Sequence, residues 1–439
     1  FSLVFTYFKE KITLLYFFDL LGGGAGVIVM LFLFPHHGPF VLVWYLGLLM
    51  IVVSVLFLLS FDWRIGFFFL FALPLYVIVF QDYTKIEIRI SSEKKDVNAI
   101  GRMVKRAWDT FGYVVMVEKT NGGSFLTADF TCYTYFFYPR QNVKEYRFIT
   151  PAHNYPYVVK ENPENVGIVG VGAGKDILTA LGFGARYVYG AEFNTTIYRW
   201  FKDYYSNEFA PGGQFSNVFI EREEGRFFLR RSPREYDVLV FDNSISQVAL
   251  SSGSFTLAES YLFTVEAMMD YYQRLKDGGV VYLSNPLPHV MRFVSLWKEA
   301  FRRMGISSQL KHSLIIYAEE NPSYPKCKIL VKKGVFTPEE VHKVETFASS
   351  IGHKPLYVPG REIKNEVSRF VLAEDVSRFY RRSDQELRPS TDDWPFFSQH
   401  VRTDEEKLTA EVMQFRFYYP QPFLMLKQMK INHGQLAKS

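Results

Sequence analysis

The first 80 residues are almost wholly apolar, and this constrains the chain more than any other feature. The remaining sequence has ordinary globular composition with charges throughout. Such an asymmetry predicts a membrane part followed by a water-soluble part. Aromatic residues make up 18% of the chain, with 43 Phe, and their excess falls largely in the N-terminal stretch, where Phe can face lipid. We therefore attribute the aromatic excess to the lipid environment rather than to a binding site.

The membrane part is expected to cover residues 1–82 and to contain at least three spans. A hydrocarbon core needs roughly 20 helical residues to cross. Three apolar stretches meet that length, or nearly so, at residues 12–34, 39–60 and 64–80. The third is short and contains a proline, so we expect it to be kinked or tilted. Because the chain begins in mid-hydrophobic sequence, we expect it to be part of a longer protein with further membrane helices upstream.

Basic residues on the two sides of these spans predict the orientation. Lys9 and Lys11 flank the first span, and a larger basic cluster follows the third at residues 85–95. An odd number of spans places the two clusters on opposite sides of the membrane. The positive-inside rule then places the soluble part in the cytoplasm.

Asp19 lies at the centre of the first span, where a carboxylate is costly and is by default a functional or helix-packing residue. The glycines at 22–24 and 26 offer a small-residue face for close helix contact beside it. We favour packing over transport, because a single carboxylate is thin evidence for an ion path. A transporter with a regulatory nucleoside domain would rest on Asp19 alone.

Charge and cysteine content exclude several classes of protein. The net charge is +5, but 45 acidic residues are interleaved with the basic ones, so nucleic acid is not an expected partner. Cys132 and Cys327 are far apart, with no C-x-x-C or His spacing nearby. Neither a disulfide framework nor a structural zinc site follows, and a reducing compartment fits. We expect no metal.

The period of the apolar residues predicts the fold of the soluble part. Residues 83–158 should form a small β-rich region, since an Asn-Gly turn signal at 121–123 separates two strand-like runs. Over residues 159–335, apolar runs alternate with helix-like segments, which is typical of a parallel sheet with helices on both faces. The predicted strands are 166–170, 187–191, 217–220, 236–241, 279–283 and 313–318.

A further apolar run at 327–331 follows the last of these after a short turn, so it should pair antiparallel. The predicted fold is therefore α/β, a Rossmann-like sheet of class I methyltransferase type with an antiparallel last strand. Residues 336–439 should form a helical extension and tail. Thr337 as N-cap, a proline at the next position and Glu340 at the third predict a helix to about residue 350.

The strongest local motif is a glycine-rich turn between a predicted strand and a predicted helix. Gly170, Gly172 and Gly174 are followed by Lys175 and Asp176. Glycines let the backbone turn tightly and let a ligand approach without side-chain collision, at the point where open sheets bind ligands. The pattern G-x-G-x-G lacks the third glycine of the dinucleotide motif, so NAD is disfavoured.

Acidic residues follow three successive predicted strands after this loop. Glu192 comes about 20 residues after the glycines, where a carboxylate can accept both ribose hydroxyls. Glu224 follows the third strand, where it can accept the exocyclic amine of adenine, and Asp242 follows the fourth. A single acidic residue there is usually a solvated helix cap. Three of them after a glycine loop favour a nucleoside site.

These motifs resemble those of the polyamine aminopropyltransferases, the spermidine and spermine synthases, and more closely their membrane-fused relatives. The likeness covers roughly residues 110–300. The segments that carry it are 154–157 leading into 165–170, then 224–229, 236–240, 258–267 and 275–280. The resemblance implies a donor that is S-adenosylmethionine or its decarboxylated form. It also implies that Glu192 binds ribose, that Glu224 lies near adenine, and that Asp242 lines the transfer site as the candidate catalytic residue.

The chain also departs from that family in the half of the site that would hold a polyamine. The acidic residue that grips the aminopropyl amine inside the loop is replaced by Ala173, and the second Asp, acting as base, by Ile245. The family's Tyr and acidic contacts before the loop fall near Phe148 and Thr150. Lys175 should repel a cationic donor tail and attract the carboxylate of S-adenosylmethionine.

Two kinds of function remain open from the sequence. The first is a membrane-bound alkyl transferase that uses an S-adenosylmethionine-type donor and transfers an aminopropyl or methyl group. The second is a non-catalytic structural or assembly subunit of a larger membrane complex. The glycines and acidic residues favour the first, because a purely structural fold has no need for them together. The replacement of the base by Ile245 favours the second.

Overall fold

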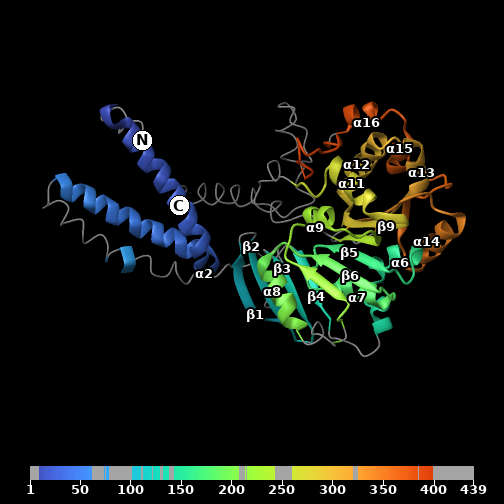
Figure 1. Ribbon diagram of the computed structural model, residues 1–439, viewed down its shortest axis with the longest axis horizontal. Coiled ribbons are helices and arrows are strands. Elements are labelled where there is room, and N and C mark those ends of the chain that lie inside the picture. The colour runs from blue at the N-terminus through green and yellow to red at the C-terminus, as the bar shows by residue number, and fades with distance from the viewer. Residues whose placement is uncertain are drawn as a thin grey trace, which may run out of the picture. The chain divides into compact units, whose positions relative to one another are not determined.

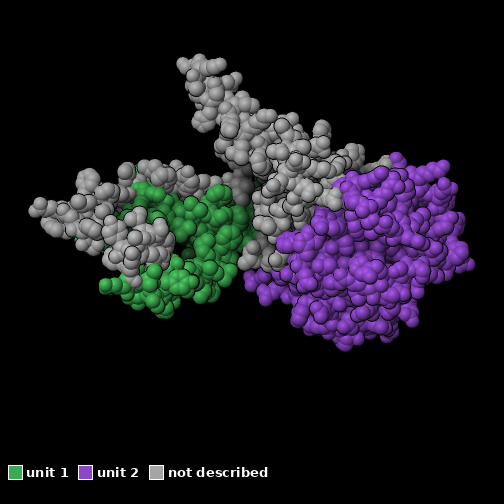
Figure 2. Space-filling model, turned by 90° about the horizontal axis from the view of Figure 1, so that it is seen from above, with its two compact units in different colours: residues 1–120, 127–130 green, residues 121–126, 131–439 purple. Residues whose placement is uncertain are grey.

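The computed structural model describes residues 9–61, 74, 76–78, 101–109, 112–120, 122–128, 132–137, 143–206, 213, 215–242, 260–319, 325–383 and 385–398. The chain divides into two compact units, which Figure 2 colours separately. Unit 1 comprises residues 1–120 and 127–130, and unit 2 comprises residues 121–126 and 131–439.

The apolar N-terminal sequence forms a long helix, α2 (Ile12–Phe61), after a short 3-10 turn, η1 (Lys9–Lys11). It is broken at Gly38, which has φ 71° and ψ 171°. The break matches the predicted boundary between the first two apolar stretches, and most large apolar side chains of both limbs are exposed. Among the described residues, one helix segment, Ile12–Phe57, is long and apolar enough to span a membrane, with a mean hydropathy of 2.7. The third stretch, 64–80, lies largely outside the described residues.

The break in α2 packs within unit 1 against strand β1 (Gly101–Asp109). The ring centroids of Phe34 and Trp108 are 5.6 Å apart. A Cβ atom on Gly38 would lie 2.3 Å from the Nε1 atom of Trp108, so both the positive φ and the close indole require glycine here. The turn between the helix limbs thus lies beside the first strand of the β region.

Four short strands form the predicted β-rich region, β1 followed by β2 (Gly112–Lys119), β3 (Ser124–Ala128) and β4 (Cys132–Phe136). They lie in one sheet in chain order, and β1 pairs antiparallel with β2. Gly122 and Gly123 have φ of 88° and 85°. These positive angles explain why the predicted turn needs glycines.

The main sheet of unit 2 has eight strands in the order β12-β10-β11-β9-β8-β5-β6-β7. The pairs between β7, β6, β5, β8 and β9 are parallel, while β11 is antiparallel to both β9 and β10. The predicted parallel sheet with an antiparallel last strand is thereby confirmed, and each predicted strand is present. The strands are β5 (Asn165–Val169), β6 (Tyr187–Ala191), β7 (Val218–Glu221), β8 (Tyr236–Asp242), β9 (Leu275–Pro286), β10 (Leu314–Glu319), β11 (Lys326–Lys332) and β12 (Lys354–Tyr357).

Helices lie on both faces of this sheet (Figure 1). The largest apolar core joins one face to α9, α11, α12 and α15. The helices are α6 (Tyr155–Val159), α7 (Lys175–Gly182), α8 (Thr195–Tyr204), α9 (Gly225–Arg231), α11 (Val265–Gln273), α12 (Val290–Arg303), α13 (Leu310–Ser313), α14 (Pro338–Ser350), α15 (Glu366–Leu372) and α16 (Ser377–Arg382). Short 3-10 turns are η3 (Val143–Phe148), η4 (Pro151–His153), η5 (Leu287–His289) and η6 (Ser307–Gln309).

The C-terminal extension is built into unit 2. The predicted helix is confirmed as α14, and Thr337 and Glu340 form its capping box. Strand β12, which the sequence pattern did not indicate, pairs with β10 at the edge of the main sheet. The amide of Val265 donates to the carbonyl of Ser390 at 2.9 Å, so the extension also closes over the start of α11. The tail beyond residue 398 lies outside the described residues.

Candidate functional site

The glycine loop joins β5 to α7, as predicted, and its three glycines have positive φ angles of 80°, 56° and 87°. At Gly172, a Cβ atom would lie 2.9 Å from the Oγ1 atom of Thr134. At Gly174, it would lie 2.6 Å from the ring of Phe201. Backbone conformation and close packing therefore both require the glycines.

The amide groups of this loop bind within the protein. The amide of Gly172 donates to Oε2 of Glu192 at 2.9 Å, and that of Ala173 donates to Oγ1 of Thr134 at 3.0 Å. The amides of residues 170, 171 and 174 donate to backbone carbonyls. A loop that cradles a phosphate offers its amides to the ligand instead. The amides of residues 170–174 are thus not arranged as a phosphate cradle.

Glu192 follows β6 and links the loop to the next helix. The residue is only 7% exposed. Its Oε2 atom accepts the amide of Gly172 and its Oε1 atom accepts the amide of Asn194, the latter at 2.9 Å. These two hydrogen bonds fix the carboxylate at the carboxyl edge of the sheet, between the glycine loop and the start of α8.

Glu224 caps helix α9. Its two carboxylate oxygens accept the amides of Arg226 at 3.0 Å and Phe227 at 2.8 Å. These are the contacts of an N-cap residue, which stabilise the first turn of a helix. The predicted position near adenine stays a prediction, since Glu224 has a sufficient structural role in capping.

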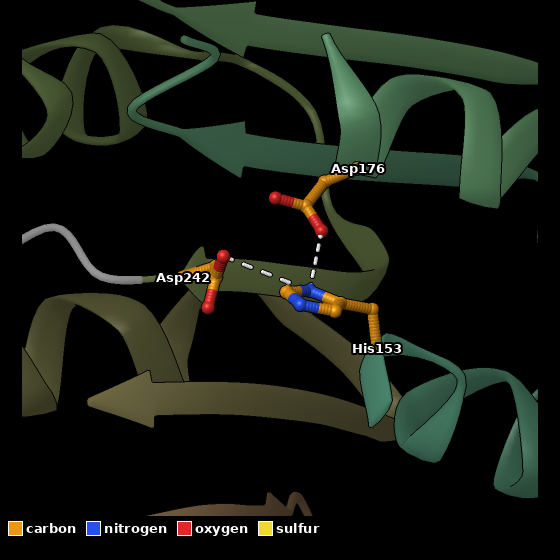
Figure 3. A group of neighbouring side chains, drawn as sticks. All are labelled: His153, Asp176 and Asp242. Carbon is orange, nitrogen blue, oxygen red and sulfur yellow. Dashed lines mark hydrogen bonds and ion pairs between the residues drawn. The ribbon is translucent and has the colours of Figure 1, made fainter. Parts of the chain in front are cut away.

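Asp242, at the end of β8, lies in a compact cluster with groups from η4 and α7. Figure 3 shows His153 between Asp176 and Asp242. The Nζ atom of Lys175 donates to Oδ2 of Asp242 at 2.8 Å and to Nε2 of His153 at 3.0 Å. The Nδ1 atom of His153 is 2.9 Å from Oδ1 of Asp176. The side chain of Asp242 is 7% exposed and that of Lys175 is 17% exposed. Lys175 and Asp176 thus both point into this cluster.

The hydrogen-bond pattern assigns one tautomer to His153. An ammonium can only donate, so Nε2 accepts from Lys175 and the ring proton lies on Nδ1, which donates to Asp176. Burial lowers the pKa of His153 and favours this neutral form, with Lys175 adding to the effect. Burial opposes the charge on Lys175, but Asp242 and Asp176 outweigh it and raise the pKa of that ammonium.

Asp242 is surrounded by cations. Burial alone would raise its pKa, but the ammonium groups of Lys175, Lys326 and Lys328 hold the pKa well below its usual range. The Nζ atom of Lys326 is 3.9 Å from Oδ1 of Asp242. A carboxylate with so low a pKa is a weak general base, because it gains little from taking a proton.

The carboxyl end of β8 and the start of α7 define the topological switch point of the sheet. Strand β5 lies between β6 and β8. From β6 the sheet continues outward to β7, and from β8 it continues outward to β9 on the opposite side. Ligands of open α/β sheets bind in the crevice at such a point. Lys175 and Asp242 therefore meet at the position where a ligand is expected.

The same cluster has the residue types of a cation site. Among the described residues, His153, Asp176 and Asp242 form a group whose possible metal-ligand atoms all lie within 4.8 Å of one another. One imidazole nitrogen and two carboxylates suit a divalent metal. The ammonium of Lys175 already contacts two of the three residues, however, so the cluster has a cation of its own.

The structure adds one residue that the sequence did not indicate. His153 lies in the turn before the glycine loop, and no spacing or motif connects it with Asp242. The predicted replacement of the second acidic residue, Ile245, lies outside the described residues. Phe148, at the place of a family polyamine contact, is 80% exposed.

Protonation of His153 should make stability depend on pH. Its pKa in the folded state is below the ordinary 6.5, so stability present above that pH is lost as the pH falls toward 5. One such group contributes a slope of at most about 1.4 kcal/mol per pH unit. We expect His153→Gln to reduce the slope of the unfolding free energy between pH 7 and 5, measured by urea unfolding in detergent. His342→Gln, at an exposed position, is the control. An unchanged slope in His153→Gln would contradict the assigned neutral form.

Comparison with known proteins shows that the chain is similar to several solved structures. No protein-family model matches the chain, and no curated protein matches it. The spermidine synthase of Thermotoga maritima is 18% identical with a TM-score of 0.38, covering 65% of this chain and 87% of that one. A probable spermidine synthase from Corynebacterium glutamicum is 14% identical with a TM-score of 0.43, covering 62% and 94%. An rRNA methylase from Streptococcus thermophilus is 15% identical with a TM-score of 0.28, covering 42% and 95%.

Spermidine synthases are thus among the solved structures to which the chain is similar. The strand order of the main sheet, the antiparallel β11 and the glycine loop after β5 define the fold class. This is a Rossmann-like α/β fold of the class I methyltransferase type.

Proposed function

We propose that this protein is a membrane-anchored transferase that binds an S-adenosylmethionine-type donor at the carboxyl edge of the main sheet and transfers an alkyl group from it. The observation that carries the proposal is the fixed position of Glu192. Its buried carboxylate is held by the amides of Gly172 and Asn194, one in the glycine loop and one before α8. A carboxylate at this strand end, about 20 residues after the glycine loop, is where a Rossmann-like site binds ribose hydroxyls.

Two exposed aromatic residues support a nucleoside as the ligand. Phe193 follows Glu192 and is 51% exposed, and Phe227 lies in the first turn of α9 and is 56% exposed. A purine presents flat apolar faces that suit contact with exposed aromatic rings. Phe193 is next to Glu192 in the sequence, and Phe227 lies in the helix that Glu224 caps.

Replacing Glu192 should weaken nucleoside binding. We expect Glu192→Ala to cost about 1–3 kcal/mol of binding free energy, because ribose hydroxyls would lose a charged acceptor. Isothermal titration calorimetry of the full chain in detergent, with S-adenosylmethionine, its decarboxylated form and 5′-methylthioadenosine, measures this. Glu221→Ala is the matched control, since Glu221 ends the neighbouring strand β7 and pairs with Arg231. An unchanged dissociation constant in Glu192→Ala would show that the carboxylate only holds the glycine loop in place. If the wild type binds none of the three compounds, the proposal is wrong.

The donor should carry a carboxylate. Lys175 stands where the resembled enzymes have an acidic environment, so S-adenosylmethionine should bind more tightly than its decarboxylated form. Since Lys175 shares its charge with Asp242, the preference should be only about 0.2–1 kcal/mol, or severalfold, and should shrink with salt. Asp242→Asn should widen the preference by freeing Lys175, and Lys175→Asp should reverse it. Tighter binding of the decarboxylated form by the wild type would contradict this selection.

A second candidate is a non-catalytic subunit that retains the fold. The contact between Lys175 and Asp242 favours it, because the candidate catalytic carboxylate is neutralised from within the protein. The two candidates differ in turnover. Incubation of the full chain with donor labelled in its adenosine part, together with a protein-free cell extract, should release labelled methylthioadenosine or S-adenosylhomocysteine if the chain is an enzyme. Donor binding without release of either product favours the non-catalytic subunit.

The membrane anchor is proposed on the length and exposure of α2. Its apolar side chains would be costly in water and suit a hydrocarbon environment. We propose that the main sheet faces the cytoplasm, on the charge distribution of the sequence. Resistance of the protein to alkaline extraction, with protease access to unit 2 only from the cytoplasmic side, is the expected result.

A further inference from the structure

The ammonium group of Lys175 lies among groups that would recognise any primary ammonium ion. It is 2.8 Å from a carboxylate oxygen of Asp242 and 3.0 Å from the acceptor nitrogen of His153. His153 is oriented for this contact by Asp176, 2.9 Å from its other ring nitrogen. The three residues are nearly buried, so their contacts act in a medium of low dielectric constant. We name Asp242, His153 and Asp176 the cation cradle.

The cradle lies at the topological switch point, where a ligand of this fold is expected. A ligand amine that reached Asp242 would have to take the position of the Lys175 ammonium. Its charge would otherwise lie beside a like charge at a separation of a few Å, which is strongly unfavourable in a poorly solvated site. The protein therefore fills this position with its own cation.

We propose that Lys175 is a specificity-determining residue whose ammonium occupies the position of an acceptor amine, so that the site excludes polyamines and other alkylammonium ions. The inference rests on the proposed function in one respect, that substrates enter at this edge of the sheet. It narrows the acceptor class of the transferase to compounds that do not present an ammonium group to Asp242.

The charges around the cradle also disfavour the binding of a polyamine. Two more lysines and one more carboxylate face the cradle, with Lys328 only 2.7 Å from Glu319 and 3.0 Å from the hydroxyl of Ser284. The group then contains three ammonium ions and three carboxylates, namely Lys175, Lys326, Lys328, Asp176, Asp242 and Glu319. The neutral His153 adds no charge. A tri- or tetra-cation finds no excess of negative charge to attract it.

Removal of the Lys175 side chain should convert the cradle into an amine site. Lys175→Ala deletes three carbons and the ammonium, which is the composition of n-propylammonium. We expect this ion to bind the full-length variant in detergent saturably and to raise its midpoint of thermal unfolding by about 2–4 °C. The wild type should show no shift with n-propylammonium, putrescine or spermidine. Propan-1-ol, which has the same shape and no charge, should not replace the amine in Lys175→Ala.

Two further variants test the geometry of the cradle. Lys175→Met fills the same space without a charge, and Lys175→Ala/Asp242→Asn opens the space but removes the carboxylate, so neither should bind n-propylammonium. If Lys175→Ala does not fold alone, recovery of folded protein on refolding with n-propylammonium, but not with propan-1-ol, is the readout. The proposal is overturned if the wild type binds putrescine or spermidine at Asp242, so that Asp242→Asn abolishes the binding. It is equally overturned if the amine neither binds nor rescues Lys175→Ala.

Failure of this inference is distinguishable from failure of the proposed function. Calorimetry with S-adenosylmethionine is run on the same wild-type sample. A wild type that binds neither donor nor amine refutes the donor site, while the response of Lys175→Ala to n-propylammonium still tests the cradle. A wild type that binds both donor and polyamine supports the transferase and refutes the role of Lys175.

Discussion

Replacing Lys175 by Met should lower the free energy of unfolding of unit 2 by about 3–5 kcal/mol. The substitution leaves the carboxylate of Asp242, whose side chain is 7% exposed, without the ammonium that lies 2.8 Å from it. A buried charge that loses its partner has no water to replace the lost contact, so its full desolvation cost acts against folding. Urea unfolding of the full chain in a mild detergent, followed by tryptophan fluorescence, measures the loss.

The double variant Lys175→Met/Asp242→Asn should recover most of that stability, because both charges of the closest pair are removed together. Arg302→Met is the matched control. Arg302 pairs with Glu299 at 2.6 Å, but its side chain is 67% exposed, so water can replace the contact and this variant should cost far less than Lys175→Met. If Lys175→Met lowers the free energy of unfolding no more than Arg302→Met does, the contact with Asp242 does not form in solution. The ammonium of Lys175 then does not occupy the cation cradle.

Replacing Arg226 by Met should cost about 3 kcal/mol and release the C-terminal extension. The guanidinium is 8% exposed and contacts Asp392 through two nitrogens, at 2.6 and 3.0 Å, and Asp270 through Nε at 2.8 Å. Both carboxylates are more exposed than the arginine and can regain water, so the cost stays at the lower end for a buried ion pair. Urea unfolding measures it, and limited proteolysis should show faster cleavage near residue 392.

Two variants define what Arg226 contributes. Arg226→Lys keeps the charge but not the forked pair of donors, so it should recover only part of the stability. Arg231→Met, on the same helix, removes a half-exposed ion pair with Glu221 and Glu223 and should cost much less than Arg226→Met. Unchanged proteolysis of Arg226→Met would show that residues 385–398 are held by other contacts.

Much of the fold follows from local sequence patterns. The strands of the main sheet were predictable because buried strands are short apolar runs between helix-like segments or turns, and β5 to β11 lie where those runs occur. Helix α14 was predictable because Thr337, Pro338 and Glu340 satisfy the amides of its first turn with neighbouring atoms. The break at Gly38 and the glycine loop were predictable because positive φ angles favour glycine.

The candidate site was predictable only in part. Glu192 and Asp242 were found because both follow strands, and the carboxyl ends of parallel strands meet at one edge of the sheet. The hydrogen-bonding partners of these two carboxylates could not be predicted from the sequence. Whether Lys175 offers its charge to a ligand or to Asp242 depends on the direction of a flexible side chain, which sequence spacing does not encode.

The sequence by itself determined the apolar N-terminal part, the order of strands and helices in the Rossmann-like domain, and the place of the glycine loop. These depend on interactions between residues a few positions apart, which leave a period or a motif in the chain. Only the tertiary structure brought His153 and Lys175 to Asp242, and Arg226 to Asp392, which lies 166 residues further along. Such contacts depend on how β5, β8 and the C-terminal extension pack together. The groups involved pair through space, where one lysine or aspartate has no local signature that distinguishes it from a solvated one.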